Sequence, residues 1–159
     1  MKNFKKLVLF ISVAMFLSCS NSSDEDLGLT GEGTLTAKVD GQAWSSLKAT
    51  VGAVVSSGVL AVQGSTSNGE FIRINIINYT GVGTYKTGDN LSNVNSASYG
   101  TIDPIATWMS TFNLGSGTIE ITEDSATTVK GTFSFTGINA SAGNSSKAIT
   151  EGTFNAPKS

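Results

Sequence analysis

Histidine is absent from this chain of 159 residues, and cysteine occurs only once, as Cys19. The absence of imidazole excludes the Ser-His and Cys-His nucleophile systems and most zinc sites, and it removes the usual titrating group near neutral pH. Exported domains are often stabilised by disulfides. With a single cysteine the chain forms no internal disulfide, so packing alone must stabilise whatever domain is present.

Charge and long apolar runs are also scarce. Charged residues make up only 14% of the chain, and no basic patch is present that could neutralise a row of phosphates. We therefore expect no nucleic-acid partner. The longest apolar run, 7–17, spans about 11 residues, against the roughly 20 that a membrane-spanning helix requires. We therefore expect no retained transmembrane anchor.

The apolar run belongs instead to an N-terminal export signal. Lys2, Lys5 and Lys6 precede it, and a serine and Cys19 follow it. A basic start, a short apolar region and a small residue before the cut are typical of a secretory signal. A cysteine directly after the cut resembles a bacterial lipoprotein signal, so we expect removal of 1–18 and a diacylglycerol on the Cys19 thiol. Cleavage leaves seven basic against twelve acidic residues, a net charge near −5.

An acidic stretch follows the lipid cysteine. Residues 19–33 are mostly Ser, Asn, Asp, Glu and Gly, and they bury too little apolar surface to offset chain entropy, which predicts a flexible tether. The polar cluster within it resembles the signal that directs Bacteroidota lipoproteins to the outer leaflet; the alternative is a solvated spacer. The resemblance implies an outer-membrane lipoprotein that faces outward at the cell surface. The cluster consists of Ser22, Ser23, Asp24, Glu25 and Asp26.

From residue 34 to residue 159 the sequence is typical of one all-β domain. Alternating apolar residues between Gly, Asn, Ser and Asp clusters predict strands joined by turns, among them a two-residue hairpin turn at Asp40-Gly41. We expect about nine strands in an antiparallel, meander-rich β-sandwich or flattened β-barrel. Trp44 should close one end of the core, 80–103 should be a loop-rich middle, and a strand should run over 105–114. The clearest apolar faces are Leu35, Ala37 and Val39, then Ile72, Ile74 and Ile76, then Ile119 and Ile121.

Several linked motifs resemble one family of small Bacteroidota lipoproteins. Residues 38–44 (KVDGQAW) match the VDG-x-x-W opening of the family, and 117–123 (GTIEITE), 129–135 (VKGTFSF) and 151–155 (EGTFN) match its C-terminal signature. The family has no known function, so the resemblance implies no catalytic residue. The Gly-Thr-Phe units also have a structural explanation, in which glycine permits close backbone approach, threonine faces solvent and phenylalanine packs.

Without histidine, catalysis would depend mainly on carboxylates, as in glycoside hydrolysis, which requires two of them at a fixed separation. The available carboxylates lie in turns, at loop ends or at solvent-facing strand positions, and no two are marked as neighbours. We therefore expect no enzymatic activity and no cofactor, with a carboxylate hydrolase and a hydrolase inhibitor as alternatives. The carboxylates considered are Glu70, Asp103, Glu120, Glu123, Asp124 and Glu151.

The segment 89–95 (DNLSNVN) is rich in side-chain oxygens, which are the ligands of calcium. It has one carboxylate, however, and lacks the spacing of a known calcium loop. Asn and Asp are also the residues with which a turn binds its own backbone. We therefore expect turn chemistry and no metal site, although the sequence leaves calcium binding within 80–103 open.

Three aromatic residues flank or follow the Gly/Asn/Ser-rich middle, and we take Tyr85, Tyr99 and Trp108 as the candidate ligand-binding residues. Binding residues concentrate on loops carried by a rigid scaffold, and aromatic faces beside amides suit a sugar or a peptide; the alternative is that these rings line the core. We expect a non-enzymatic binding module, held to the membrane by the lipid on Cys19, whose ligand is a glycan, a peptide or an envelope protein. The alternative function is a structural or assembly component of the envelope.

Overall fold

The computed structural model describes residues 32–159, and its regular structure is almost entirely β. Eleven strands form one continuous sheet with antiparallel pairing, which confirms the predicted all-β class. The only helical piece among these residues is a single 3₁₀ turn, η2 (Lys48–Thr50). The strands are β1 (Thr34–Val39), β2 (Gln42–Ser45), β3 (Gly52–Ser56), β4 (Val59–Ser65), β5 (Phe71–Ile77), β6 (Gly83–Thr87), β7 (Ser96–Ile102), β8 (Ile105–Thr111), β9 (Ser116–Asp124), β10 (Thr128–Asn139) and β11 (Ser145–Pro157).

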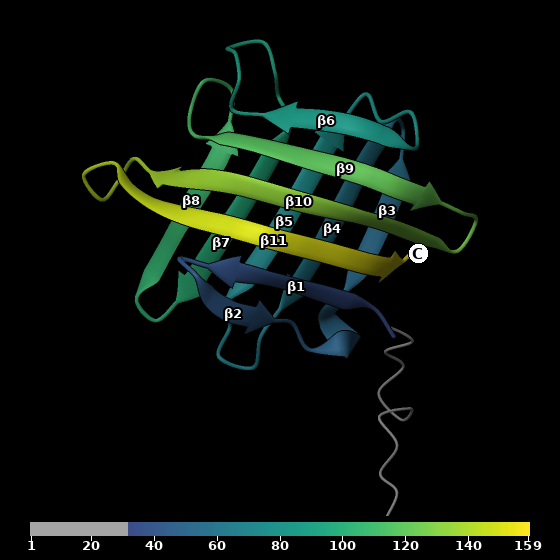
Figure 1. The fold of residues 1–159 in the computed structure, drawn as a ribbon, viewed down its shortest axis with the longest axis horizontal. Helices are drawn as coiled ribbons and strands as arrows, with labels where there is room; N and C mark the ends of the chain where they lie inside the picture. The colour runs from purple at the N-terminus through teal and green to yellow at the C-terminus, as the bar shows by residue number, and fades with distance from the viewer. Residues whose placement is uncertain (1–31) are drawn as a thin grey trace, which may run out of the picture.

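The sheet folds over into two layers whose strands cross steeply (Figure 1). The front layer contains β2, β1, β11, β10, β9 and β6, and the rear layer contains β8, β7, β5, β4 and β3. The long strand β10 joins the two layers where Ile138 pairs with Met109 of β8. At another corner Lys158, near the end of the chain, forms a bridge with Ala53 of β3. The result is one curled sheet whose two layers enclose a shared core.

The core follows from the alternation along the strands. The predicted inward residues of β1 are all buried, and Ile72, Ile74 and Ile76 of β5 have no exposed surface. Burial of each such side chain contributes about 1.5–3 kcal/mol to folding, because apolar area leaves water. Trp44 is also buried among them, as predicted. The alternation along each strand therefore determines which side chains pack between the two layers.

The two Gly-Thr-Phe units lie side by side on β10 and β11 in reciprocal register. Gly131 is opposite Phe154, and Phe133 is opposite Gly152. A Cβ on Gly152 would lie 2.6 Å from the Phe133 ring, and a Cβ on Gly131 would lie 2.7 Å from the Phe154 ring. Each glycine therefore makes room for the ring on the other strand, while the intervening threonines are exposed. This arrangement confirms the structural explanation of the repeated unit.

The prediction of a loop-rich middle at 80–103 was wrong, because β6 and β7 lie there. The alternation of large apolar residues is missing from β7, since packing requires small residues. A Cβ on Gly100, for example, would clash with the ring of Phe71 on β5. The next strand is shorter than predicted: β8 ends at Thr111, and Phe112 has a φ of 51° in the turn that follows.

The predicted export signal 1–18, the lipid site and the export cluster lie outside the described residues. Within the described part of the chain, no helix has the length and hydropathy that crossing a membrane requires. The first strand begins at Thr34. The positions outside are Cys19, Ser22, Ser23, Asp24, Glu25 and Asp26.

Candidate functional site

The structure brings together two of the three predicted aromatic residues. Tyr99 of β7 and Trp108 of β8 are cross-strand partners, and their rings stack with centroids 5.8 Å apart and planes at 30°. Tyr99 is buried, whereas Trp108 is half-buried. The third residue, Tyr85, lies on β6 and contacts Tyr79 instead. The stacked pair is therefore the centre of the candidate site.

Hydrogen bonds orient both rings of the stacked pair. The Tyr99 hydroxyl donates to Oε1 of Glu70 at 3.1 Å, and Nε1 of Trp108 donates to Oγ of Ser145 at 3.2 Å. Glu70 directly precedes β5 and Ser145 begins β11, so both layers contribute to the site. Each ring consequently has its polar atom paired while its apolar body packs.

An ion pair lies beside the indole of Trp108. Nζ of Lys147 is 5.5 Å from the ring centroid and donates to Oδ2 of Asp40 at 2.7 Å. Oδ1 of Asp40 also accepts the backbone N–H of Ala148 at 2.9 Å. The ammonium group is thus held at the indole by a carboxylate that the backbone itself positions.

These contacts determine the protonation states at the site. The hydrogen bond from Lys147, followed by that from the Ala148 amide, lowers the pKa of Asp40, so this carboxylate stays ionised at neutral pH. Burial, followed by the hydrogen bond to Glu70, raises the pKa of Tyr99 to about 12, so its hydroxyl remains a donor. Asp40 is a fixed negative charge and has no proton to give, which suits binding better than general acid catalysis.

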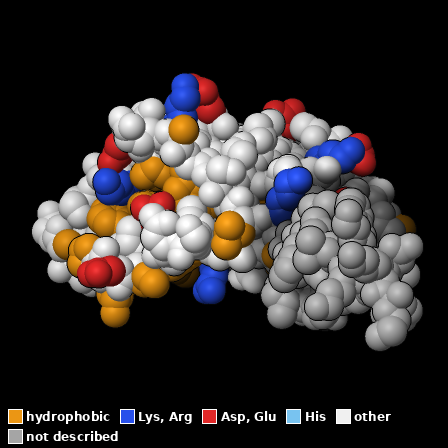
Figure 2. All heavy atoms as spheres, turned by 90° about the horizontal axis from the view of Figure 1, so that it is seen from below, with side chains coloured by type: hydrophobic (Ala, Val, Ile, Leu, Met, Phe, Trp, Pro, Cys, Tyr) orange, Lys and Arg blue, Asp and Glu red, His pale blue; other side chains and the backbone are white. Residues whose placement is uncertain are grey.

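Exposed apolar side chains lie at the turn that joins the two strands of the stacked pair. Ile102 and Ile105 flank the β7–β8 turn and are 60% and 89% exposed. Gly69 lies close to the Ile102 side chain and directly precedes Glu70, so this turn adjoins the β4–β5 turn. Figure 2 shows hydrophobic side chains gathered on one side of this view, among acidic and basic ones. We call the stacked pair, its polar partners and the two isoleucines of the turn the Trp108 end; it consists of Asp40, Glu70, Tyr99, Ile102, Ile105, Trp108 and Lys147.

Sequence reasoning missed the charged partners and the isoleucines at the Trp108 end. Lys147 and Asp40 are 107 residues apart in the chain, so no local spacing indicates their ion pair. The isoleucines did leave a signal. Ile102 and Ile105 bracket Asp103-Pro104, so two large apolar residues stand at a turn, where polar residues are usual.

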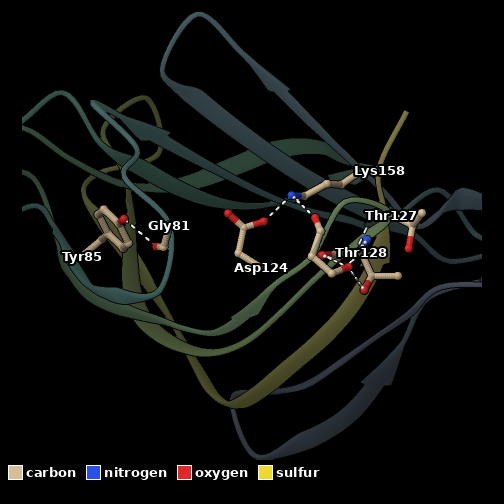
Figure 3. A network of polar contacts seen from close by, with 7 residues as sticks. Gly81, Tyr85, Asp124, Thr127, Thr128 and Lys158 are labelled. Carbon is tan, nitrogen blue, oxygen red and sulfur yellow. Dashed lines mark hydrogen bonds and ion pairs between the residues drawn. The ribbon is translucent and has the colours of Figure 1, made fainter.

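Tyr85 belongs to a second cluster, which lies beyond the other end of β5 and which we call the Tyr79 end. The rings of Tyr85 and Tyr79 are 5.8 Å apart, and the Tyr85 hydroxyl donates to the carbonyl of Gly81 at 2.8 Å (Figure 3). Nζ of Lys158 donates to the carboxylate of Asp124 in the same view. Burial, followed by the neighbouring Asp124, raises the pKa of Tyr79 above its usual value.

The asparagine-rich segment 89–95 uses its side chains internally. Nδ2 of Asn93 donates to Oδ1 of Asp89 at 2.6 Å, and Oδ1 of Asn90 accepts the backbone N–H of Ser92 at 3.0 Å. Bonds of this kind are turn chemistry. Within residues 32–159, no group of three or more His, Cys, Asp or Glu side chains is placed to hold a metal ion.

Comparison with known proteins gives one family. A family model described as a domain of unknown function, DUF6252, matches residues 31–156. Neither the curated proteins nor the solved structures yield a significant match to the chain. The matched range includes all eleven strands apart from the last residue of β11. The chain therefore belongs to the DUF6252 family of domains of unknown function.

Proposed function

We propose that this protein is a lipid-anchored lipoprotein of the Bacteroidota outer membrane whose β domain binds another envelope protein at the Trp108 end. The lipid anchor is supported by the basic start, the short apolar run and Cys19. The acidic cluster after Cys19 supports a position that faces outward from the cell. The binding role is non-enzymatic and needs no cofactor.

The exposure of Ile102 and Ile105 at the turn that joins the strands of Tyr99 and Trp108 is the observation that carries this proposal. Monomeric proteins rarely expose large apolar side chains as a group, and such groups are typical of protein interfaces. The strongest contacts at interfaces come from apolar and aromatic anchors surrounded by a polar rim. Trp108 supplies an aromatic anchor, and Lys147 with Asp40 supplies part of the rim.

A protein fits this end better than a glycan does. A sugar ring that stacks on an aromatic side chain needs a free face of that ring, and the ammonium group of Lys147 occupies space beside the Trp108 indole. Displacing it would break its ion pair with Asp40. An apolar side chain of a protein can cover the isoleucines and leave the ion pair intact.

A photo-crosslinking residue at Ile105, introduced into the full-length protein in its native cells, tests the proposal. We expect a discrete protein adduct from Ile105 that is missing when the crosslinker replaces Leu91, an equally apolar residue that is 73% exposed on another loop. The partner, once identified by mass spectrometry, is purified for affinity measurements. Ile105→Asp should weaken its binding about tenfold or more, because a charge would be buried at the contact. Equal affinities for Ile105→Asp and Leu91→Asp would contradict the proposal.

The anchor has its own test. Cys19→Ser should abolish labelling of the protein by a fatty-acid analogue, and labelling that persists would refute the lipid site. Alanine at Asp24, Glu25 and Asp26 together should lower the accessibility of the domain to protease added to whole cells. Unchanged accessibility would refute the outward-facing signal.

A further inference from the structure

The outward face of the rear layer is almost free of charge. Its five strands contain one charged residue, Arg73 of β5, which is also the only arginine in the chain. The charges of the front layer are largely paired, as in the salt bridges of Lys38 with Glu151 and of Lys130 with Glu123. Arg73, in contrast, forms no salt bridge with any residue of 32–159. It is a single uncompensated cation on a neutral surface.

A phenylalanine positions the guanidinium group. Cζ of Arg73 lies 5.1 Å from the ring centroid of Phe71, two residues earlier on the same face of β5. Phe71 is half-buried, and Gly100 on β7 leaves the space that its ring occupies. The ring therefore orients the guanidinium by a cation–π contact without occupying its N–H donors.

A depression of ≈ 350 Å³ adjoins Arg73. Gln63 lies directly opposite Arg73 on β4, and Ser65 lines the same depression. Neither the Gln63 amide nor the Ser65 hydroxyl has a hydrogen-bond partner among the described residues. Thr50, on the far wall, is instead fixed by its hydroxyl, which donates to the carbonyl of Ser65 at 2.9 Å. A guanidinium, an amide and a hydroxyl thus line one small-molecule-sized depression.

From this arrangement we propose that the Arg73 depression binds a carboxylate-bearing sugar, such as the uronic acid unit of an acidic polysaccharide. One guanidinium fork matches one singly charged carboxylate in a bidentate pair. The amide and hydroxyl match sugar hydroxyls. Asn75 and Ser98, beside Arg73 on the same neutral face, offer further polar groups to adjoining sugar units.

The single cation of the depression and the pairing of its strands favour a carboxylate-bearing sugar over a phosphate group and over a peptide. A phosphate group carries more than one negative charge and is usually held by several cations or backbone N–H groups, and Arg73 has no second cation among the rear strands. A peptide would be expected to add a strand at a sheet edge, whereas β4, β5 and β7 are paired on both sides. None of the residues that line the depression belongs to the Trp108 end, so the inference does not rest on the function proposed there.

Isothermal titration of the full-length protein in detergent with an oligogalacturonate tests the inference. We expect saturable binding, and a loss of about tenfold or more when the same oligosaccharide has its carboxylates reduced to alcohols. Arg73→Gln should weaken binding of the acidic form to a similar degree. Arg73→Lys should fall between, because it keeps the charge and loses the fork. Lys86→Gln, which makes the same change in net charge on β6, should leave the affinity within about twofold.

Three results would overturn the inference: no binding of oligogalacturonate or oligoglucuronate by the unmodified protein, equal binding of the reduced and acidic forms, or equal binding by Arg73→Gln. Stronger binding of inorganic sulfate or of an acidic peptide than of either sugar would also overturn it. Circular dichroism of Arg73→Gln shows whether the fold is retained, and Gln63→Ala provides a second variant that leaves the charge in place. The crosslink from Ile105 should survive Arg73→Gln, so failure of one proposal leaves the other intact.

Discussion

The Trp108 end and the Tyr79 end contain the same kinds of side chain but differ in how far solvent reaches them. Each end has an aromatic pair with ring centroids 5.8 Å apart and a lysine–aspartate pair beside it. At the Tyr79 end, the side chains of Lys158 and Asp124 are 16% and 23% exposed. At the Trp108 end, those of Lys147 and Asp40 are 32% and 44% exposed. The two ends thus share their residue types, and the ion pair of the Trp108 end is the more exposed to solvent.

The end of the chain accounts for much of the difference. Lys158 follows β11 directly, bridges to Ala53 of β3, and donates to the carbonyl of Ser125 at 2.6 Å as well as to Asp124. A backbone bridge and an ion pair therefore both hold the Tyr79 end together. At the Trp108 end the Lys147–Asp40 pair is also joined to the backbone through Ala148, but the β7–β8 turn leaves Ile105 in solvent. One end stabilises the fold, and the other is available for contact.

The largest expected difference between the ends comes from removal of each lysine. Lys158→Ala should lower the free energy of unfolding by about 2 kcal/mol, because the largely covered Asp124 carboxylate would keep its charge and lose its cationic partner. Lys147→Ala should lower it by less than about 1 kcal/mol, because both partners retain contact with water. Urea unfolding followed by circular dichroism measures both values. Equal losses would contradict the assignment of different roles to the two ends.

Removal of a single hydrogen bond at each end should give a smaller difference. Tyr85→Phe removes the donor to the Gly81 carbonyl and should cost about 1 kcal/mol. Ser145→Ala removes the acceptor of the Trp108 indole N–H, which water can replace at this exposed position, and should cost less than about 0.5 kcal/mol. Thermal unfolding of the two variants under identical conditions compares them. A larger loss for Ser145→Ala would reverse the comparison.

Acid should weaken both ends, and the Tyr79 end more strongly, because the ion pair there is less exposed to solvent. Lys158 lowers the pKa of Asp124, and Lys147 lowers that of Asp40. A carboxylate with a lowered folded-state pKa stabilises the fold above its unfolded pKa of about 3.9, and this contribution is lost as the pH falls through the folded value. Asp124→Asn should therefore flatten the decline in stability below about pH 4 more than Asp40→Asn does. The unfolding free energy measured across this acid range decides between them.

The smallest difference is expected between the hairpin turns at the two ends. Gly41 has a φ of 83° and Gly58 a φ of 74°, and a Cβ on either would meet no atom within 4 Å. Alanine at either position should cost about 1 kcal/mol through backbone strain alone. Denaturant midpoints of Gly41→Ala and Gly58→Ala should agree closely. A clear difference between the two midpoints would indicate that the solvent exposure of each end also affects its turn.

The strands with strong alternation were the part of the fold that the sequence predicted well. The isoleucines of β5 and the inward residues of β1 are buried as expected, and the Asp40-Gly41 turn has the positive φ values of a two-residue hairpin. The prediction from sequence failed for β7, where packing requires small residues. The strand β7 is built on Ala97 and Gly100, which carry no alternating signal of large apolar side chains.

By itself, the sequence determined the all-β class and the inward faces of the strands, because these depend on local alternation. Tertiary structure decided that the glycine of each Gly-Thr-Phe unit lies opposite the phenylalanine of the other. Tertiary structure alone decided that Tyr99 meets Trp108 and that Tyr85 meets Tyr79. The first pair depends on the register of β7 with β8, and the second on the position of β6 relative to the end of β5. The same holds for Lys147 and Asp40, since an ion pair between distant segments leaves no period in the sequence.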